Sequence, residues 1–403
     1  MRKLSFRRVL VGLMAVIVPA VLAGSASGQG GLTLTDLNGP RGLSTNGSVM
    51  YIAEQGTGKV LQVTQQGTVS VVASGLPSST FLEDGVPVPT GATSAINVGG
   101  TLYVTVGESR GEAGFDHVYV IKPGQAPEIF ADLLAYEQAN NVDGNLDMAG
   151  EPELLINAYD LVSDNAGGLY VSASGANAIF HVASDGTISP FAIFPNRENP
   201  LFPAVGGPEM QQVPTGLEWG PDGALYVTTL TGFPFPEEGA RVYRMSDANA
   251  DGDALDDGET TVYAEGLTTA TNLVFDTDGS LLVTEFRGFL RGDESPGQIV
   301  RVVNGAISEV VAAPLLSPTG ITIFDGEVIV SQEFLGIVSE AKAGAAIFAS
   351  LPPPAAEGGE ISPPNTGDAG LAEGTASSTA LLLATALVAI ALFGAGAFVR
   401  VHR

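Results

Sequence analysis

The chain has 403 residues, a net charge of −27 at pH 7 and no cysteine. The absence of cysteine excludes disulfide bonds, thiolate metal sites, thiol nucleophiles and covalently attached haem. The balance of 44 Asp and Glu against 17 Lys and Arg disfavours binding to nucleic acid or to anionic membrane surfaces. With 52 Gly and 25 Pro, the sequence favours short strands joined by turns over long helices.

The N-terminal segment predicts export. Residues 1–28 combine a basic start, an apolar run over 9–22 and small residues at 24–26, which is the pattern of a secretory signal peptide. The apolar run is short for a bilayer span, which disfavours an N-terminal anchor. We therefore expect the mature chain outside the cytoplasm.

Residues 29–350 repeat one strand–turn–strand unit. In the central copy, residues 213–229, apolar residues alternate on both sides of a Pro-Asp-Gly turn at 221–223, as in a β-hairpin. Related units begin near Pro40, Thr90, Tyr159, Thr271 and Pro318, roughly 50–70 residues apart. A second pair of strands follows each unit. Six copies of four strands predict an all-β fold, a six-bladed β-propeller with four-stranded antiparallel blades. Residues 32–37 alternate suitably to supply the outer strand of the last blade.

The C-terminal segments predict display on the cell surface. Residues 351–378 form a Pro/Gly-rich linker, 379–399 are apolar and long enough for a transmembrane helix, and 400–403 form a basic cytoplasmic tail. The linker contains Pro364, Asn365, Thr366 and Gly367, which match the last four positions of a sortase-type sorting signal, although Pro363 replaces its usual leucine. Two hypotheses stay open: cleavage by a sortase after Thr366 with attachment to the cell wall, or a plain anchor in the plasma membrane.

Long segments between the expected strands fall on one face of the propeller, here called the top face, where the inner strands begin. Long loops on a rigid scaffold are common binding sites. Residues 131–137 among them favour a short helix. We predict that a small molecule, glycan or protein from the extracellular space binds to channel residues and loop aromatics, namely Arg41, Glu54, Tyr159, Thr215, Phe233, Phe235, Asn272 and Glu285. The alternative is that these groups satisfy backbone ends and pack between blades.

The inventory of catalytic groups is small. Residues 29–350 hold two histidines, His117 and His181, in strand-like segments without a serine elbow nearby. We therefore name no catalytic residue and favour a non-enzymatic binding module. The alternative is a calcium-dependent, lactonase-like hydrolase that uses Glu54, Asn272 and Glu285 around a cation in the channel. A structural spacer is the third hypothesis.

An acidic segment predicts a second kind of site. Oxygen-bearing side chains at alternate positions, with Gly252 at the sixth, are typical of the start of a calcium loop. The predicted Ca²⁺ ligands are Asp247, Asn249, Asp251, Asp253 and Asp257. Gly258 stands where an EF-hand carries its bidentate glutamate, so this is not an EF-hand. We expect a structural calcium ion on the bottom face, with a solvated acidic turn as the alternative.

Several segments carry a family resemblance. Residues 76–78 (Leu-Pro-Ser), 131–137 and above all 213–235, which end in Leu-Thr-Gly-Phe-Pro-Phe, resemble the ScyD/ScyE family of secreted propeller proteins related to NHL repeats. The similarity extends over roughly residues 32–348. Residues 173–177 depart from the family, which tends to have an Asp-Ala-Gly-Gly-Asn-like run there. The resemblance implies a six-bladed propeller outside the cytoplasm and implies little about a reaction.

Overall fold

The structure is a computed structural model that describes residues 32–83, 86–108, 112–146, 150–288, 295–333 and 336–341. The predicted signal peptide (1–28), linker with sorting motif (351–378), transmembrane helix (379–399) and basic tail (400–403) lie outside the described residues. Within the described ranges, no helix has the length and apolar character needed to cross a membrane.

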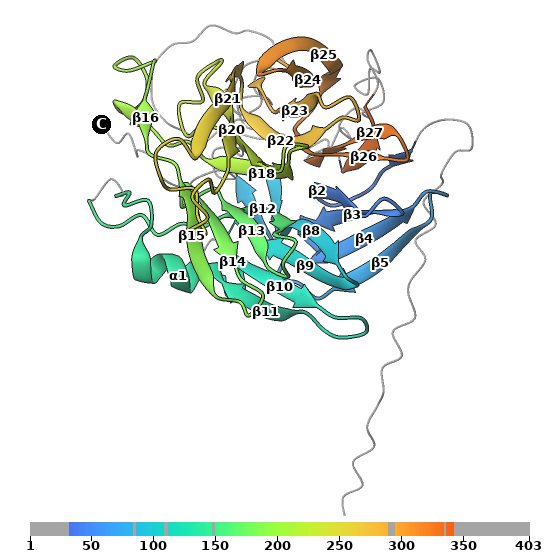
Figure 1. Cartoon of the computed structure of the whole chain (residues 1–403). Helices are drawn as coiled ribbons and strands as arrows, with labels where there is room; N and C mark the ends of the chain where they lie inside the picture. Colours follow the sequence, from blue (N-terminus) through green and yellow to red (C-terminus); the bar gives the residue numbers. More distant parts are fainter. Residues whose placement is uncertain are drawn as a thin grey trace, which may run out of the picture.

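Six four-stranded antiparallel sheets surround one axis, which confirms the predicted six-bladed propeller. In Figure 1 the inner strands β2, β8, β12, β18, β22 and β26 gather at the centre. Blade 1 contains β2 (Pro40–Thr45), β3 (Val49–Glu54), β4 (Lys59–Thr64) and β5 (Val69–Ser74). Blade 2 contains β8 (Ala92–Val98), β9 (Thr101–Val106), β10 (His117–Ile121) and β11 (Glu128–Asp132). Blade 3 contains β12 (Ala158–Ser163), β13 (Leu169–Ala173), β14 (Ala178–Val182) and β15 (Ile188–Ile193).

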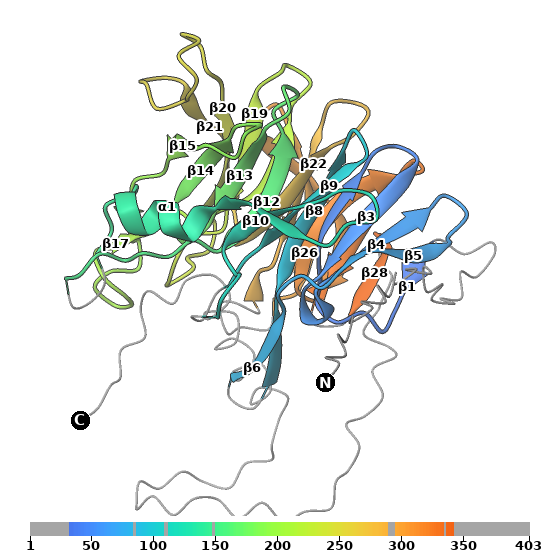
Figure 2. The ribbon, with the colours of Figure 1, turned by 90° about the horizontal axis from the view of Figure 1, so that it is seen from below.

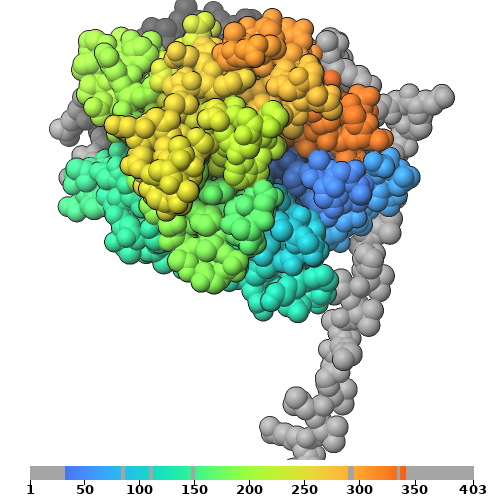
Figure 3. Space-filling view, in the orientation of Figure 1, coloured from blue at the N-terminus to red at the C-terminus, as the bar shows by residue number. Residues whose placement is uncertain are grey.

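The other three blades follow in chain order, and Figure 3 shows all six packed side by side. Blade 4 contains β18 (Pro214–Trp219), β19 (Leu225–Thr229), β20 (Ala240–Met245) and β21 (Thr260–Leu267). Blade 5 contains β22 (Ala270–Phe275), β23 (Leu281–Glu285), β24 (Gly297–Val303) and β25 (Ala306–Leu315). Blade 6 contains β26 (Pro318–Phe324), β27 (Glu327–Gln332), β28 (Ile337–Glu340) and β1 (Thr33–Leu34). Pairing of β1 with β28 joins the two ends of the body, as the alternation of residues 32–37 predicted.

Further elements project from the faces of the propeller. They are the hairpin of β6 (Ser79–Glu83) and β7 (Val86–Thr90), the short pair β16 (Arg197–Glu198) and β17 (Glu209–Met210), the 3₁₀ turn η1 (Gln55–Thr57) and the helix α1 (Leu133–Asn140). The Asp132 side chain caps α1 by accepting a hydrogen bond from Ala135 N. Figure 2 shows the β6 hairpin on one face and the loop between β20 and β21 on the opposite face.

Each inner strand carries a β-bulge close to its start. In blade 1 the pairing of the inner strand with the second strand is interrupted between Pro40 and Leu43. The equivalent interruption in blade 2 lies between Ala92 and Ser94. The residue that corresponds to Arg41 in blade 2 is therefore Thr93, and the predicted start at Thr90 is wrong. Thr90 instead ends the β6–β7 hairpin, whose Val-Pro-Val-Pro-Thr segment has the alternation of an inner strand but belongs to an insertion.

Side-chain hydroxyls on the two innermost strands connect every blade to the next, and three of them, Thr93, Thr215 and Thr271, lie at these bulges. Thr93 Oγ1 donates to Ala158 O at 2.7 Å, which joins blade 2 to blade 3. The remaining donor–acceptor pairs are Ser44–Ala95, Ser172–Thr215, Thr215–Ala270, Thr271–Pro318 and Ser331–Arg41, each from a side-chain hydroxyl to a backbone carbonyl. Because a buried carbonyl without a partner is destabilising, these bonds fix the angle between neighbouring blades around the axis.

Three recurring positions fill the outer part of the gap between neighbouring blades. The first position lies in the second strand of a blade, counted from the channel. The second position is a bulged residue in the outer strand of the same blade. The third position lies in the inner strand of the next blade. Between blades 4 and 5 they are Tyr226, Tyr263 and Phe275, with centroid distances of 5.0 and 4.9 Å from the Tyr226 ring. Between blades 3 and 4 the residues are Tyr170, Phe191 and Trp219. These aromatic triads close the gaps by edge-to-face and tilted packing.

We call the six hydrogen bonds from side-chain hydroxyls to carbonyls of the next blade the hydroxyl ring. Thr271→Val tests its role in stability. Valine keeps the shape of the side chain but removes the donor to Pro318 O and leaves this carbonyl and the Thr284 hydroxyl without that partner. We expect the free energy of unfolding in urea to fall by about 1–3 kcal/mol. Thr261→Val, at an exposed strand position, is the control and should change it by less than about 0.5 kcal/mol. Equal effects of the two substitutions would contradict a structural role for the ring.

Candidate functional site

A buried cluster of charged side chains lies at the mouth of the channel. Arg41, on the bulge of β2, is only 1% exposed and forms an ion pair with Glu108 at 2.5 Å. The guanidinium carbon of Arg41 stands 4.3 Å from the centroid of the Tyr159 ring, so a cation–π contact joins blade 1 to blade 3. The structure therefore brings together two of the predicted ligand-binding residues, Arg41 and Tyr159.

Glu333 completes this cluster from blade 6. In the amide orientation that satisfies both of its ends, Gln55 donates to Glu333 Oε1 at 2.7 Å and accepts from Arg41 Nη1 at 2.8 Å. Within the described part of the chain, Glu333 Oε2 has no hydrogen-bond partner. Burial raises the pKa of Glu333 to about 8, with Glu108 adding to the rise and Arg41 opposing it. The raised pKa favours the neutral acid, which suits a site where two full negative charges would face one arginine.

The sequence analysis missed Glu333 as a member of this cluster. The available signal was its position, since it directly follows Gln332 at the exit of a second strand, where the repeat places other acids and amides. All the charged members, Arg41, Glu108 and Glu333, are 7% exposed or less. A catalytic group has to touch its substrate, and these groups touch one another instead. The cluster is therefore suited to holding blades 1, 2, 3 and 6 together.

Glu54 and Glu285 lie at equivalent positions and have the same structural role. Glu54 accepts from the backbone nitrogen of Asn38 at 2.8 Å, and Glu285 accepts from that of Thr268 at 2.5 Å. Gln332 repeats this contact with Leu316 N. In each case the backbone donor lies two residues before an inner strand. Glu285 also binds Arg287 and Gln298 through its other oxygen. Both carboxylates thus complete backbone hydrogen bonding where the chain enters a blade.

Asn272 lies deeper in the channel than these carboxylates. It donates from Nδ2 to Asp160 Oδ2 at 3.5 Å, while Asp160 also accepts from Ser94 Oγ at 2.7 Å and from Leu217 N at 3.0 Å. Burial raises the pKa of Asp160, against the effect of these hydrogen bonds. Within the described ranges no hydrogen bond joins Asn272 to Glu54 or Glu285, and no three acidic or histidine side chains are grouped there to hold a metal ion.

One more carboxylate lies close enough to Asp160 for the two charges to interact. Glu218 lies on β18 and is partly buried. Burial and then the charge of Asp160 raise its pKa to about 7. Thr215, another predicted ligand-binding residue, is fully buried, and its hydroxyl belongs to the ring between blades. Asp160 thus lies beside the amide of Asn272 and within electrostatic reach of Glu218, while the threonine hydroxyls are used in structural bonds.

The predicted loop aromatics have different environments. Phe235 is buried, whereas Phe233 is 40% exposed, and their rings meet edge to face with centroids 6.3 Å apart. Gly206 of the β16–β17 loop lies against the Phe233 ring, because a Cβ atom placed there would be 3.5 Å from two ring carbons. Phe233 therefore belongs to a surface formed by two loops, with Phe235 as its support.

The acidic loop between β20 and β21 is folded around its own side chains. Asp247 accepts from the backbone nitrogens of Asp251 and Gly252, and Asn249 donates to Asp251 Oδ2 and Asp256 Oδ2. Asn249 thus meets Asp256, the neighbour of the predicted ligand Asp257. Asp253 lies in the same loop and accepts from Leu255 N. The pKa of Asp256 is raised mainly by Asp251, which indicates mutual repulsion of the carboxylates. The donor set is all oxygen, the ligand type that Ca²⁺ prefers, but in the described structure no three of these carboxylates converge as they would around a bound ion.

Comparison with known proteins gives a partial family match and several similar folds. A model described as a domain of unknown function (DUF7133) matches residues 204–298, from the β16–β17 loop into blade 5. No curated protein matches the chain. Among solved structures, virginiamycin B lyase from Staphylococcus aureus is 15% identical, with 77% of this chain and 98% of the lyase covered and a TM-score of 0.42.

Two further structures have similar values. A calcium-binding regucalcin from Agrobacterium tumefaciens is 12% identical, with coverage of 76% and 90% and a TM-score of 0.46. A gluconolactonase from Xanthomonas campestris is 12% identical, with coverage of 77% and 89% and a TM-score of 0.47. The similar folds thus include lyases, lactonases and a calcium-binding protein, and these values support no functional argument for this chain.

Glu333→Gln tests the protonation state of the channel-mouth cluster. Since burial raises the folded-state pKa of Glu333 above its ordinary value of about 4.5, its contribution to stability is complete below pH 4.5 and is lost as pH rises through about 8. Glutamine stays neutral, so the variant should be more stable than the wild type by about 2 kcal/mol at pH 9. The two proteins should be similar at pH 5. Urea unfolding at both pH values measures this, and a pH-independent difference would contradict it.

Proposed function

We propose that this protein is a non-enzymatic, extracellular binding module that recognises a protein segment through an apolar surface on its top face. The observation that supports this most directly is a group of exposed apolar side chains on two neighbouring loops. Leu201, Phe202, Val205 and Phe233 are 41%, 50%, 41% and 40% exposed. We call these four residues the platform. Exposed apolar groups in such numbers at one place are typical of interaction sites.

The platform is held by ordered contacts beneath it. Asn199 is buried and donates from Nδ2 to Val205 O and Gly207 O, both at 2.8 Å, while its Oδ1 accepts from Leu201 N. These three bonds close the loop between β16 and β17. Because the loop is fixed before binding, its aromatic side chains can contact a partner with little further loss of conformational entropy.

Acidic residues flank the platform and favour a cationic partner. Glu198 and Glu209 face one another across the β16–β17 pair, an arrangement of like charges that destabilises the pair until a cation binds. Glu237 and Glu238 follow the Phe233 loop and are exposed. The partner that fits these features is a peptide segment with apolar side chains flanked by Lys or Arg.

The alternative, a lactonase-like hydrolase, needs carboxylates that are available to a channel cation. Glu54 and Glu285 bind backbone groups at separate blade entrances, which leaves them poorly placed for that role. The binding hypothesis also agrees with the predicted signal peptide and C-terminal anchor, which together would display the platform at the cell surface. The ScyD/ScyE resemblance and the sortase signal remain part of this proposal.

A peptide of alternating Lys and Leu with a fluorescent label tests the platform. We expect Phe202→Ser/Phe233→Ser to weaken its binding at least about tenfold, since aromatic anchors dominate such interfaces. Val262→Ser/Val310→Ser removes two exposed apolar residues from outer strands and is the matched control. Fluorescence anisotropy at fixed ionic strength measures the affinity. If both double variants bind the peptide as the wild type does, the platform is not its binding site.

We also propose that the β20–β21 loop binds one structural Ca²⁺ ion through the carboxylates and amide of Asp247, Asn249, Asp251 and Asp253. Glu259 is buried at the base of the loop and accepts from the backbone nitrogens of Ala248 and Asn249, so it shapes the loop. A divalent cation would relieve the repulsion that raises the pKa of Asp256.

Calcium removal tests this site. Chelation should lower the melting temperature of the wild-type body by several degrees, because an ion that binds only the folded state stabilises it. Asp247→Asn/Asp251→Asn should melt at the same temperature with and without chelator. Asp185→Asn, in an exposed turn of blade 3, is the control and should keep the response. A wild type that is insensitive to chelation and contains no calcium by elemental analysis would contradict the proposal.

A further inference from the structure

The gap between blades 1 and 2 differs from those closed by aromatic triads. The strand registers place Tyr51 at the first position, Val72 at the bulged second position and Asn97 at the third. Tyr51 faces Ser44 as Tyr226 faces Glu218, and Asn97 faces Leu102 as Phe275 faces Leu281. Here valine and asparagine replace the second and third aromatic rings. The volume that two rings fill in other gaps is therefore open.

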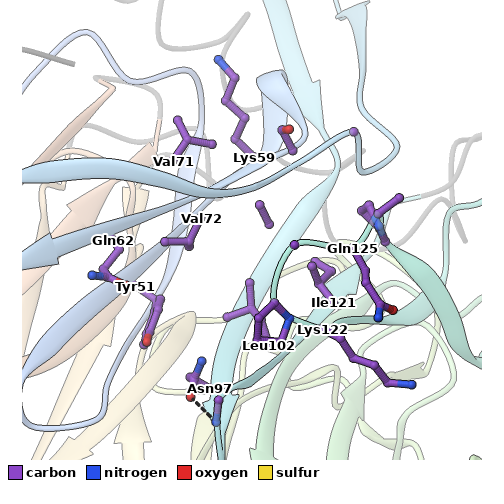
Figure 4. A pocket seen from close by; sticks show the side chains of 18 residues that line it. Tyr51, Lys59, Gln62, Val71, Val72, Asn97, Leu102, Ile121, Lys122 and Gln125 are labelled. Atoms are coloured by element: carbon purple, nitrogen blue, oxygen red, sulfur yellow. Dashed lines mark hydrogen bonds between the residues drawn. The ribbon is translucent and has the colours of Figure 1, made fainter. Parts of the chain in front are cut away.

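A cavity occupies this position. Its volume is about 910 Å³, and Tyr51, Val72 and Asn97 all line it. Half of the lining is apolar and includes Val71, Leu102 and Ile121, of which the last two belong to the buried core between the blades. Figure 4 shows these residues on the two walls, one from blade 1 and one from blade 2. The volume is within the range of small-molecule sites, whose linings also combine apolar side chains with a few polar groups.

The charge in this cavity is opposite to that of the molecule. Its 18 lining residues include no Asp or Glu, although the chain has 44 of these residues. They do include Lys59 and Lys122, the two lysines of the described ranges. In those ranges neither lysine has an ion-pair partner, whereas Arg241, Arg244 and Arg301 all pair with carboxylates. An acidic protein thus keeps two unpaired ammonium groups at one cavity.

The two lysines come from different blades. Lys59 begins β4 of blade 1, and Lys122 follows β10 of blade 2. In Figure 4 Lys59 lies at the top of the view and Lys122 at the lower right, with Ile121 between them, and the two side chains extend away from each other. Gln62 and Gln125 add uncharged hydrogen-bonding groups to the lining. A ligand that satisfies this lining has an apolar body and acidic groups at both ends.

We propose that this cavity is a binding site for an elongated organic dianion, which lays its apolar body against Val72, Leu102 and Ile121 and pairs its acidic ends with Lys59 and Lys122. The site is separate from the platform and does not depend on the function proposed for it. The missing aromatic rings provide the volume, the core residues provide the apolar contact, and the lysines provide the charge selectivity.

Dodecanedioate, a twelve-carbon dicarboxylate, is the probe, and isothermal titration calorimetry of the propeller in its full chain measures the affinity. Dodecanoate and dodecanediol, which have one and no carboxylate, are the comparison ligands. We expect the dianion to bind more tightly than dodecanoate by about three- to tenfold, and the diol to bind weakest. Equal affinity for all three ligands would overturn the charge assignment.

Filling the cavity is the decisive substitution. Val72→Tyr/Asn97→Phe reproduces the triad of Tyr226, Tyr263 and Phe275, so it should preserve the fold and abolish dianion binding. Thermal melting checks the fold. If this variant does not fold, Val72→Leu/Asn97→Met is the milder filling variant and should still weaken binding at least tenfold. A folded variant of either kind that binds dodecanedioate as the wild type does would overturn the proposal.

Single lysine variants test the ionic contacts. Lys59→Gln and Lys122→Gln should each weaken dianion binding three- to tenfold and reduce the preference over dodecanoate. Arg244→Gln changes the net charge by the same amount at a distant ion pair and should leave binding unchanged. Phe202→Ser/Phe233→Ser should also leave it unchanged, since the platform is on other loops. A loss with Arg244→Gln equal to that with the lysine variants would show a general charge effect and overturn the site.

Discussion

The hydrogen bonds from side-chain hydroxyls to the carbonyls of the next blade are the constraint on which the rest of this structure depends. In blades 2, 4 and 5 a bulge places a threonine of the inner strand out of the ladder, so its side chain can reach the adjacent blade. In blades 1, 3 and 6 the serines Ser44, Ser172 and Ser331 make the equivalent contact. The Thr215 hydroxyl meets Ala270 O, and Thr271 meets Pro318 O. Since every blade is connected in this way, the channel has a fixed width and the residues at its mouth have fixed neighbours.

This constraint explains where sequence reasoning about the site succeeded and where it failed. Arg41 and Tyr159 were expected at the channel because they occupy the repeated position, and they do meet there. Thr215 occupies the same position, but its hydroxyl donates to the Ala270 carbonyl of the next blade. Composition alone cannot distinguish a hydroxyl that binds a ligand from one that binds a backbone carbonyl, because the difference lies in the carbonyl of a neighbouring blade.

The fold itself was predictable because its signals are local. Strand alternation and turn residues, such as Pro-Asp-Gly at 221–223, are visible within single hairpins, and the hairpin recurs six times. The position of the second inner strand was not predictable in the same way. Thr90 follows an alternating segment, and only the pairing of β6 with β7 shows that this segment is an insertion. Glu333 was missed since its environment comes from Gln55 and Arg41, far away in sequence.

Once the strand registers are known, the repeat also explains why there is a cavity between blades 1 and 2. Alignment of the blades by their strand pairs puts Val72 in the place of Tyr263 and Asn97 in the place of Phe275. A repeat fold tolerates different residues at these positions because the hydroxyl contacts hold neighbouring blades together at the axis, through Ser44 and Ala95 in blades 1 and 2. Between blades 5 and 6 the same positions hold the aliphatic residues Leu282, Val311 and Ile323. The inner part of each gap thus maintains the architecture, which leaves the outer part free to diverge. Lys59 and Lys122, in a chain of net charge −27, show that this divergence changed the electrostatics of the gap as well as its volume.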